Sequence, residues 1–175
     1  MIAVDKTNVF IGKLMVLVTL LAVVVITFEV VMRYVFQRPT NWGHEFMTLL
    51  FGIQYFMAAG YAHYHRAHVR VDVFYSTRKR RTRAFLDLFT AIFFFTFNIV
   101  LLYTCWTFYW SSQTMHGGGI LFGIEMPGEL SLTDWAPAFY PVKFMMPLGA
   151  FMLLLQGIVW LIRDLHVAIT GREFA

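Results

Sequence analysis

Few side chains in this sequence could do chemistry, and most of them lie where an apolar stretch begins or ends. Glu29 and Arg33 are four residues apart, which places them on one face of a helix. A carboxylate within a membrane span is by default a candidate for proton or substrate binding. Because Arg33 lies one turn away and near the end of the stretch, we interpret the two residues as a structural ion pair. Proton or substrate binding is the alternative.

The histidines raise the question of a metal or a haem. His63, His65, His68 and Asp72 lie close together in the sequence, but His63 and His65 point apart on a helix and the spacing matches no established metal site. All 6 histidines lie at or outside the ends of the apolar stretches. Haem-binding histidines would instead face each other inside a helix bundle. We therefore expect no metal and no cofactor in this chain.

Other catalytic arrangements are missing from the sequence as well. No nucleophile stands beside a base, and Gly117 to Gly119 do not open a helix as a phosphate-binding loop would. The polar residues within the apolar stretches, Gln54, Asn98 and Gln156, are of the kind that hydrogen-bond between helices. So few polar groups offer little from which to build a solute pathway. We expect no catalytic and no substrate-binding residues here, and a chain that assists a partner.

The composition is that of an integral membrane protein. Hydrophobic residues make up 59% of the chain and charged residues 14%, against about 45–50% and about 25% in soluble domains. The formal net charge of +4 would suggest nucleic acid as a partner of a soluble protein. In a membrane protein it points to lipid headgroups instead, so we predict no nucleic-acid binding.

Four apolar stretches predict an all-α fold, a single membrane domain over residues 1–175 with a bundle of four transmembrane helices. The spans are expected at about 14–32, 46–64, 84–110 and 142–162. The first covers about 28 Å at about 1.5 Å per residue, close to the hydrocarbon thickness of about 30 Å. No small-residue cleavage site follows it, which favours a retained span over a signal peptide. A short interfacial helix is expected near Asp134 to Phe139.

The loop over residues 65–83 predicts the orientation. It holds half of the 14 Lys and Arg residues, and positive charge beside membrane spans stays in the cytoplasm. Both termini are then cytoplasmic, and the loop over residues 111–140 is periplasmic. The residues taken to determine this topology are Arg78, Lys79, Arg80, Arg81 and Arg83.

Short motifs in a fixed order link the chain to a known family. Glu29 and Arg33 end the first span, and Trp42 and Glu45 precede the second. Gly60 is followed, after the second span, by the segment His68-Val69-Arg70-Val71-Asp72. The fourth span opens with Tyr140-Pro141-Val142-Lys143 and continues through Met146-Pro147-Leu148-Gly149 and Leu154-Leu155-Gln156. In these motifs, and in length and layout, the chain resembles the small membrane subunit (DctQ-like, or Q subunit) of tripartite ATP-independent periplasmic (TRAP) transporters.

The resemblance implies a multi-pass protein of the bacterial inner membrane that works with two partners. A large membrane subunit, M, binds sodium ions and the substrate and moves its substrate-binding part as an elevator. A periplasmic substrate-binding protein delivers the substrate, typically an organic acid anion. Uptake is a sodium-driven symport without ATP, and the small subunit enlarges the fixed scaffold.

On this resemblance, a set of motif residues is expected to hold the subunit's fold or its seam with the large subunit. They are Glu29, Arg33, Trp42, Glu45, Gly60, His68, Asp72, Lys143, Pro147 and Gly149. Two other functions stay open. One is a membrane anchor of a redox complex, and the other is a small four-span exporter, which would need an unpaired carboxylate within its first span.

Overall fold

The computed structural model describes residues 1–66, 80–115, 120–121, 124–125 and 128–170. Within these residues the fold is helical, with α1 (Ile2–Tyr34), α2 (Gly43–Tyr64), α4 (Arg80–Thr114) and α5 (Tyr140–Thr170). Two strands of two residues each, β1 (Ile120–Leu121) and β2 (Ile124–Glu125), pair antiparallel beyond α4. The all-α prediction is therefore confirmed in outline.

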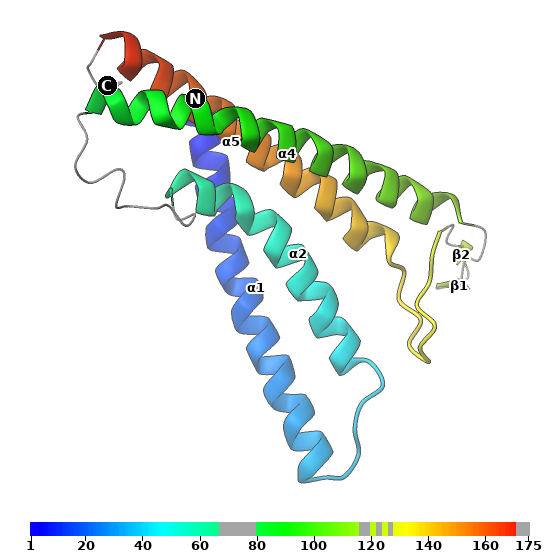
Figure 1. Cartoon of the computed structure of the whole chain (residues 1–175). Coiled ribbons are helices and arrows are strands. Elements are labelled where there is room, and N and C mark those ends of the chain that lie inside the picture. The colour runs from blue at the N-terminus through cyan, green and yellow to red at the C-terminus, as the bar shows by residue number, and fades with distance from the viewer. Residues whose placement is uncertain (67–79, 116–119, 122–123, 126–127, 171–175) are drawn as a thin grey trace.

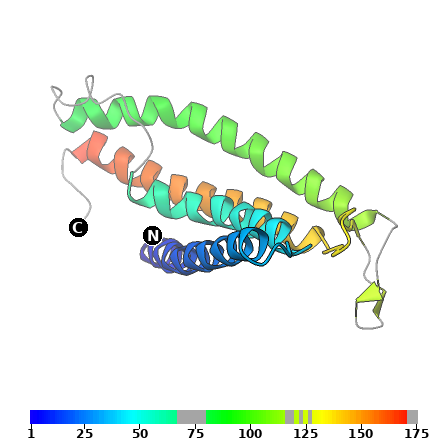
Figure 2. The same cartoon turned by 90° about the horizontal axis from the view of Figure 1, so that it is seen from below.

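The four helices lie side by side in one row, in the order α1, α2, α5, α4 (Figure 2). Each packs on its neighbours, and α1 meets α5 only over a short stretch. The row is narrow where α1 begins and α5 ends, which we call the terminal end. It spreads toward the opposite end, which we call the loop end and which carries residues 35–42 and 128–139 (Figure 1).

A single row, unlike a bundle closed around a common interior, leaves the outer faces of its helices uncovered by the chain. In water the apolar outer faces of these helices would have to be buried, but lipid solvates them as well as a neighbouring helix does. Only 17% of the most apolar window of α1 and 6% of that of α4 are buried within the chain. The apolar character of the helices therefore demands a bilayer or a partner, and does not by itself demand a closed bundle.

Three helices of the described part of the chain are long and apolar enough to cross a membrane: α1, α4 over Phe85–Thr114, and α5. Helix α2 is not among them. Its 22 residues reach about 33 Å at about 1.5 Å per residue, but it carries His44, Glu45 and His63 near its ends. The fourth span stays a prediction, as does the sidedness of the termini.

The expected interfacial helix at residues 134–139 is not formed. This segment turns back on itself, and Leu130 and Ala138 form an antiparallel bridge. Ala136 adopts a left-handed φ of 43°, and Pro137 follows it without an N–H to donate. A proline disfavours the helical conformation in the residue before it, which explains why no helix begins here.

Glycines set the spacing of neighbouring helices. A Cβ on Gly149 of α5 would lie 2.4 Å from the carbonyl oxygen of Phe56 in α2. A Cβ on Gly60 of α2 would lie 2.4 Å from Oδ1 of Asn8 in α1. Close approach through small residues is a common way for helices to associate in lipid. At Gly52, by contrast, a Cβ would meet nothing within 4 Å.

The contrast between these glycines gives a matched pair of substitutions. Gly149→Ala forces α2 and α5 apart and should lower the free energy of unfolding by about 1–3 kcal/mol, as overpacking does. Gly52→Ala should leave it unchanged or slightly higher, because alanine favours helix. Unfolding of the detergent-purified protein, followed by circular dichroism, measures both. Equal stability of the two variants would contradict this packing.

Candidate functional site

Buried polar side chains of the described residues gather near the two ends of the row. Glu29, Ser112 and Ser131 lie toward the loop end, and Asn8 and Gln156 toward the terminal end. Asn98 is the exception. It is fully buried near the middle of α4, and neither polar atom of its amide has a hydrogen-bond partner. The site therefore consists of clusters at the helix ends, with little polar character between them.

The carboxylate of Glu29 closes the turn between α1 and α2. Its side chain is almost fully buried, and Arg33 Nη2 donates to Oε1 at 3.0 Å. The backbone N–H of Thr40 donates to Oε2 at 3.3 Å, and the Thr40 hydroxyl donates to the same oxygen. The predicted Glu29–Arg33 pair is thus formed, and it is extended by a residue eleven positions further along the chain.

Thr40 connects the Glu29 carboxylate to the first turn of α2. Its hydroxyl oxygen accepts a hydrogen bond from the N–H of Gly43 at 3.2 Å, which satisfies one of the free donors of a helix start. Trp42 stacks on Phe28 of α1 with ring centroids 6.3 Å apart. A side chain on Gly43 would meet Glu29, since a Cβ there would lie 2.8 Å from Oε2.

Lys143 connects the loop over residues 128–139 to the helices. Its ammonium pairs with Glu129 and lies 4.1 Å from the ring centroid of Phe108 in α4. The ion pair lowers the pKa of Glu129, chiefly through the hydrogen bond from Lys143. The carboxylate of Glu45 in α2 accepts a hydrogen bond from the Thr133 hydroxyl. Both motif residues therefore bind the same loop.

A chain of amides and charges ties α1 to α5 at the terminal end. Asn8 Nδ2 donates to Gln156 Oε1 at 2.7 Å, and Gln156 Nε2 donates to Asp5 Oδ1 at 2.9 Å. Asp5 also pairs with Arg163. Gln156 thus makes the interhelical hydrogen bonds expected of it. The oxygen of Gln54 is buried without a partner.

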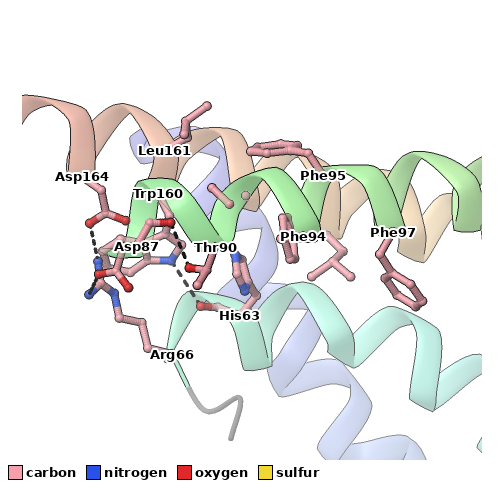
Figure 3. Close-up of a pocket in the computed structure, with 13 residues that line it drawn as sticks. His63, Arg66, Asp87, Thr90, Phe94, Phe95, Phe97, Trp160, Leu161 and Asp164 are labelled. Atoms are coloured by element: carbon pink, nitrogen blue, oxygen red, sulfur yellow. Dashed lines mark hydrogen bonds and ion pairs between the residues drawn. The ribbon is translucent and has the colours of Figure 1, made fainter. Parts of the chain in front are cut away.

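Arg66 is the residue whose role sequence reasoning missed. It lies just after α2, and its Nη2 is 2.9 Å from Asp164 of α5 while its Nη1 is 3.8 Å from Asp87 of α4 (Figure 3). Its guanidinium lies 3.8 Å from the ring centroid of Trp160. In the sequence, Arg66 was counted only among the positive charges that predict the orientation. In the structure it joins three helices. The presence of Asp87 and Asp164 at two other span ends was the available signal.

Several predicted residues have no described geometry. His68, Asp72, Arg78 and Lys79 lie outside the described residues, and the side chains of Arg80 and Arg81 are not described. Arg83 lies in the first turn of α4, and Pro147 and Gly149 are buried in α5. Over the described ranges, no three His, Cys, Asp or Glu side chains come together as metal ligands would.

The contribution of the Thr40 hydroxyl to the Glu29 cluster can be tested by substitution. Thr40→Val keeps the shape of the side chain but removes both the donor to Glu29 and the acceptor of the Gly43 N–H, so the thermal midpoint should fall. Thr27→Val is the matched control, because the exposed Thr27 hydroxyl donates only to the Val23 carbonyl of its own helix. If both variants melted at the same temperature as the wild type, the turn would not depend on this cluster.

The Glu129–Lys143 pair should make the loop sensitive to acid. Because the folded state lowers the pKa of Glu129 below its ordinary value of 4.5, the pair stabilises fully above that pH. This stabilisation is lost as the pH falls through the lowered pKa. Glu129→Gln and Lys143→Met should each remove that part of the pH dependence of thermal unfolding. A Glu129→Gln curve parallel to the wild-type curve in this range would rule out the pair as its source.

Comparison with known families assigns the chain. The family model described as tripartite ATP-independent periplasmic transporters, DctQ component, matches residues 22–167. No curated protein matches the chain in sequence. The matched region contains the turn closed by Glu29, the Lys143 contacts and the three helix ends that meet at Arg66. The chain therefore belongs to the DctQ family and is the small permease subunit of a TRAP transporter.

Proposed function

We propose that this subunit is a passive membrane scaffold for the large M subunit during sodium-driven import of an organic acid anion. On this proposal the M subunit binds the sodium ions and the substrate, and a periplasmic binding protein delivers the substrate. The chain itself binds neither. It lies in the bacterial inner membrane with both termini in the cytoplasm, as its basic loop predicts.

The observation that carries the proposal is the single row of helices (Figure 2). A solute crossing a bilayer needs polar groups along an enclosed path. One layer of helices has no interior in which to enclose such a path. The polar clusters of the described residues lie near the ends of the row, and each ties helices or a loop together. A protein built in this way supports transport by providing a fixed surface on which a partner subunit packs.

The outer faces of the row suit such a partner. Helices α1 and α4 form the two edges, and both leave most of their apolar surface uncovered by the chain. Gly52 of α2 has open space around its Cα hydrogen, so another subunit's helix could approach the backbone closely there. We propose that these surfaces contribute to the seam. On this view the motif residues Glu29, Arg33, Glu45 and Lys143 hold the subunit's own shape.

The other two functions find less support. The family is a transporter component, so the anchor of a redox complex has no observation in its favour. A small exporter would need an unpaired carboxylate in its first span. The carboxylate found there, Glu29, accepts hydrogen bonds from Arg33 and Thr40.

Reconstitution tests the proposal directly. Liposomes carrying this chain alone should take up no organic acid anion above background. Liposomes carrying it with the M subunit, and supplied with the binding protein, should show uptake only under an inward sodium gradient. The M subunit without this chain is the control, and its uptake should be strongly reduced. Uptake by this chain alone, or uptake that does not depend on the sodium gradient, would refute the proposal.

A further inference from the structure

A groove with a volume of about 500 Å³ lies at the terminal end, along the first turns of α1 and beside the end of α2. Tyr64 of α2 lines it together with one face of α1. The residues of that face are Ile2, Asp5, Lys6, Val9, Phe10 and Lys13. The proposed scaffold role does not require such a groove.

Two lysines of this groove have no partner within the described residues. Lys6 and Lys13 are exposed, and no hydrogen bond or ion pair joins either ammonium to a described side chain. The two residues are seven positions apart, which corresponds to about two turns and about 10.5 Å along the helix. Their stems are long and flexible, and both line one groove. One anion between them can therefore contact both ammonium groups.

The carboxylate that lines the groove does not neutralise these lysines. Gln156 Nε2 donates to Asp5 Oδ1 at 2.9 Å, and Arg163 pairs with Oδ2 of the same residue. Both partners belong to α5, and the Asp5 side chain is only 13% exposed. The charge of Asp5 is thus balanced by a guanidinium. Among the described residues that line the groove, the unpaired charge is positive.

Two other cavities of the described residues differ from this groove. One, of about 350 Å³ between α2, α4 and α5, is lined by Arg66, Asp87 and Asp164, and its guanidinium pairs with both carboxylates (Figure 3). The other, of about 540 Å³ between α4 and α5, is lined by apolar and aromatic residues and by no charged side chain. Of these three, only the groove along α1 presents cations that no described carboxylate binds.

The groove begins where the membrane boundary is predicted. Lys13 directly precedes the first predicted span at 14–32, and Tyr64 ends the second at 46–64. Helix α1 continues without a break from that span back to Ile2. The two lysines therefore lie at and beyond the level where lipid headgroups begin, on the side predicted to be cytoplasmic.

Apolar side chains accompany the cations. Val9 and Phe10 lie between the two lysines in the sequence and line the same groove. Ile2 and Phe10 are 71% and 68% exposed, although they precede the predicted span. A soluble anion would leave these two side chains in contact with water. A lipid covers them with its glycerol and the first part of an acyl chain, and this decides between the two sources of a phosphate.

We propose that this groove binds an anionic phospholipid, with the phosphate held between the ammonium groups of Lys6 and Lys13. Each ammonium has three N–H donors, and hydrogen bonds from an ammonium to a phosphate are charge-assisted. The Tyr64 hydroxyl supplies a further donor, and the apolar part of the lipid lies on Val9 and Phe10. A choline headgroup is disfavoured because its cation would face the two ammonium groups.

The bound lipid fixes the depth of α1 in the membrane. This helix has 33 residues and is therefore about 50 Å long, whereas the hydrocarbon core is about 30 Å thick. Its length alone permits several depths and tilts. A phosphate bound at Lys6 and Lys13 holds the first turns at the headgroup level.

Lipid competition on the full-length protein tests the proposal. The detergent-purified chain is equilibrated with equal amounts of palmitoyl-oleoyl phosphatidylglycerol and palmitoyl-oleoyl phosphatidylcholine, and the lipids retained after gel filtration are quantified by mass spectrometry. The wild type should retain about twentyfold more phosphatidylglycerol. Lys6→Gln and Lys13→Gln should each reduce this preference about fivefold, the effect of one basic residue beside anionic lipid.

Arg38→Gln is the matched control for net charge. Arg38 is exposed at the loop end and lines none of the three cavities, so this variant should keep the full preference. Sodium phosphate, compared with sodium chloride at the same ionic strength, separates a lipid from a free anion. Phosphate should release no more phosphatidylglycerol than chloride does, because inorganic phosphate cannot cover Val9 and Phe10.

Filling the groove tests its shape while both lysines remain. Val9→Trp should abolish the preference, whereas Val24→Trp places the same ring at an exposed position further along α1 and should leave it intact. Circular dichroism should show equal helix content in all variants. Four results would each overturn the proposal: retention of both lipids in the supplied ratio, an equal loss in Arg38→Gln, an intact preference in Val9→Trp, or specific release by phosphate. None of them bears on sodium-driven uptake.

Discussion

The structure depends on one constraint of the bilayer, which is that a polar side chain in lipid must find its partner within the protein. Apart from Asn98 and the oxygen of Gln54, the described part of the chain meets this constraint by joining polar groups across helices near the ends of the row. Glu29 closes the α1–α2 turn, Gln156 holds α5 to α1, and Arg66 draws α2, α4 and α5 together. Each contact satisfies a charge or an amide and at the same time places a helix.

Between these ends, the helices associate through close packing and not through polar contacts. Gly149 and Gly60 let backbones approach each other, and the helices need no interior because lipid covers what the chain leaves bare. This explains why a chain that is 59% hydrophobic buries so little of its own apolar surface. A single layer is a stable solution in a membrane, and it leaves two edges on which a larger subunit can pack.

Sequence reasoning was most successful where contacts are local. The Glu29–Arg33 pair follows from a spacing of four residues on one helix, and three long apolar helices follow from composition. It failed where the backbone departs from a simple pattern. The helix expected at residues 134–139 is a turn, because Ala136 takes a left-handed conformation before Pro137. Arg66 was treated as one charge among seven because its partners lie far away in the sequence.

The sequence by itself determined the class of the protein, its helices and its family, since each of these rests on composition, periodicity or motifs along the chain. Only the tertiary structure decided that the helices form a row, that Thr40 completes the Glu29 cluster, and that Arg66 meets Asp87 and Asp164 over a cavity. The physical reason is distance along the chain. Arg66 and Asp164 are 98 positions apart, and no local rule of spacing can pair residues that only the packing of helices brings together.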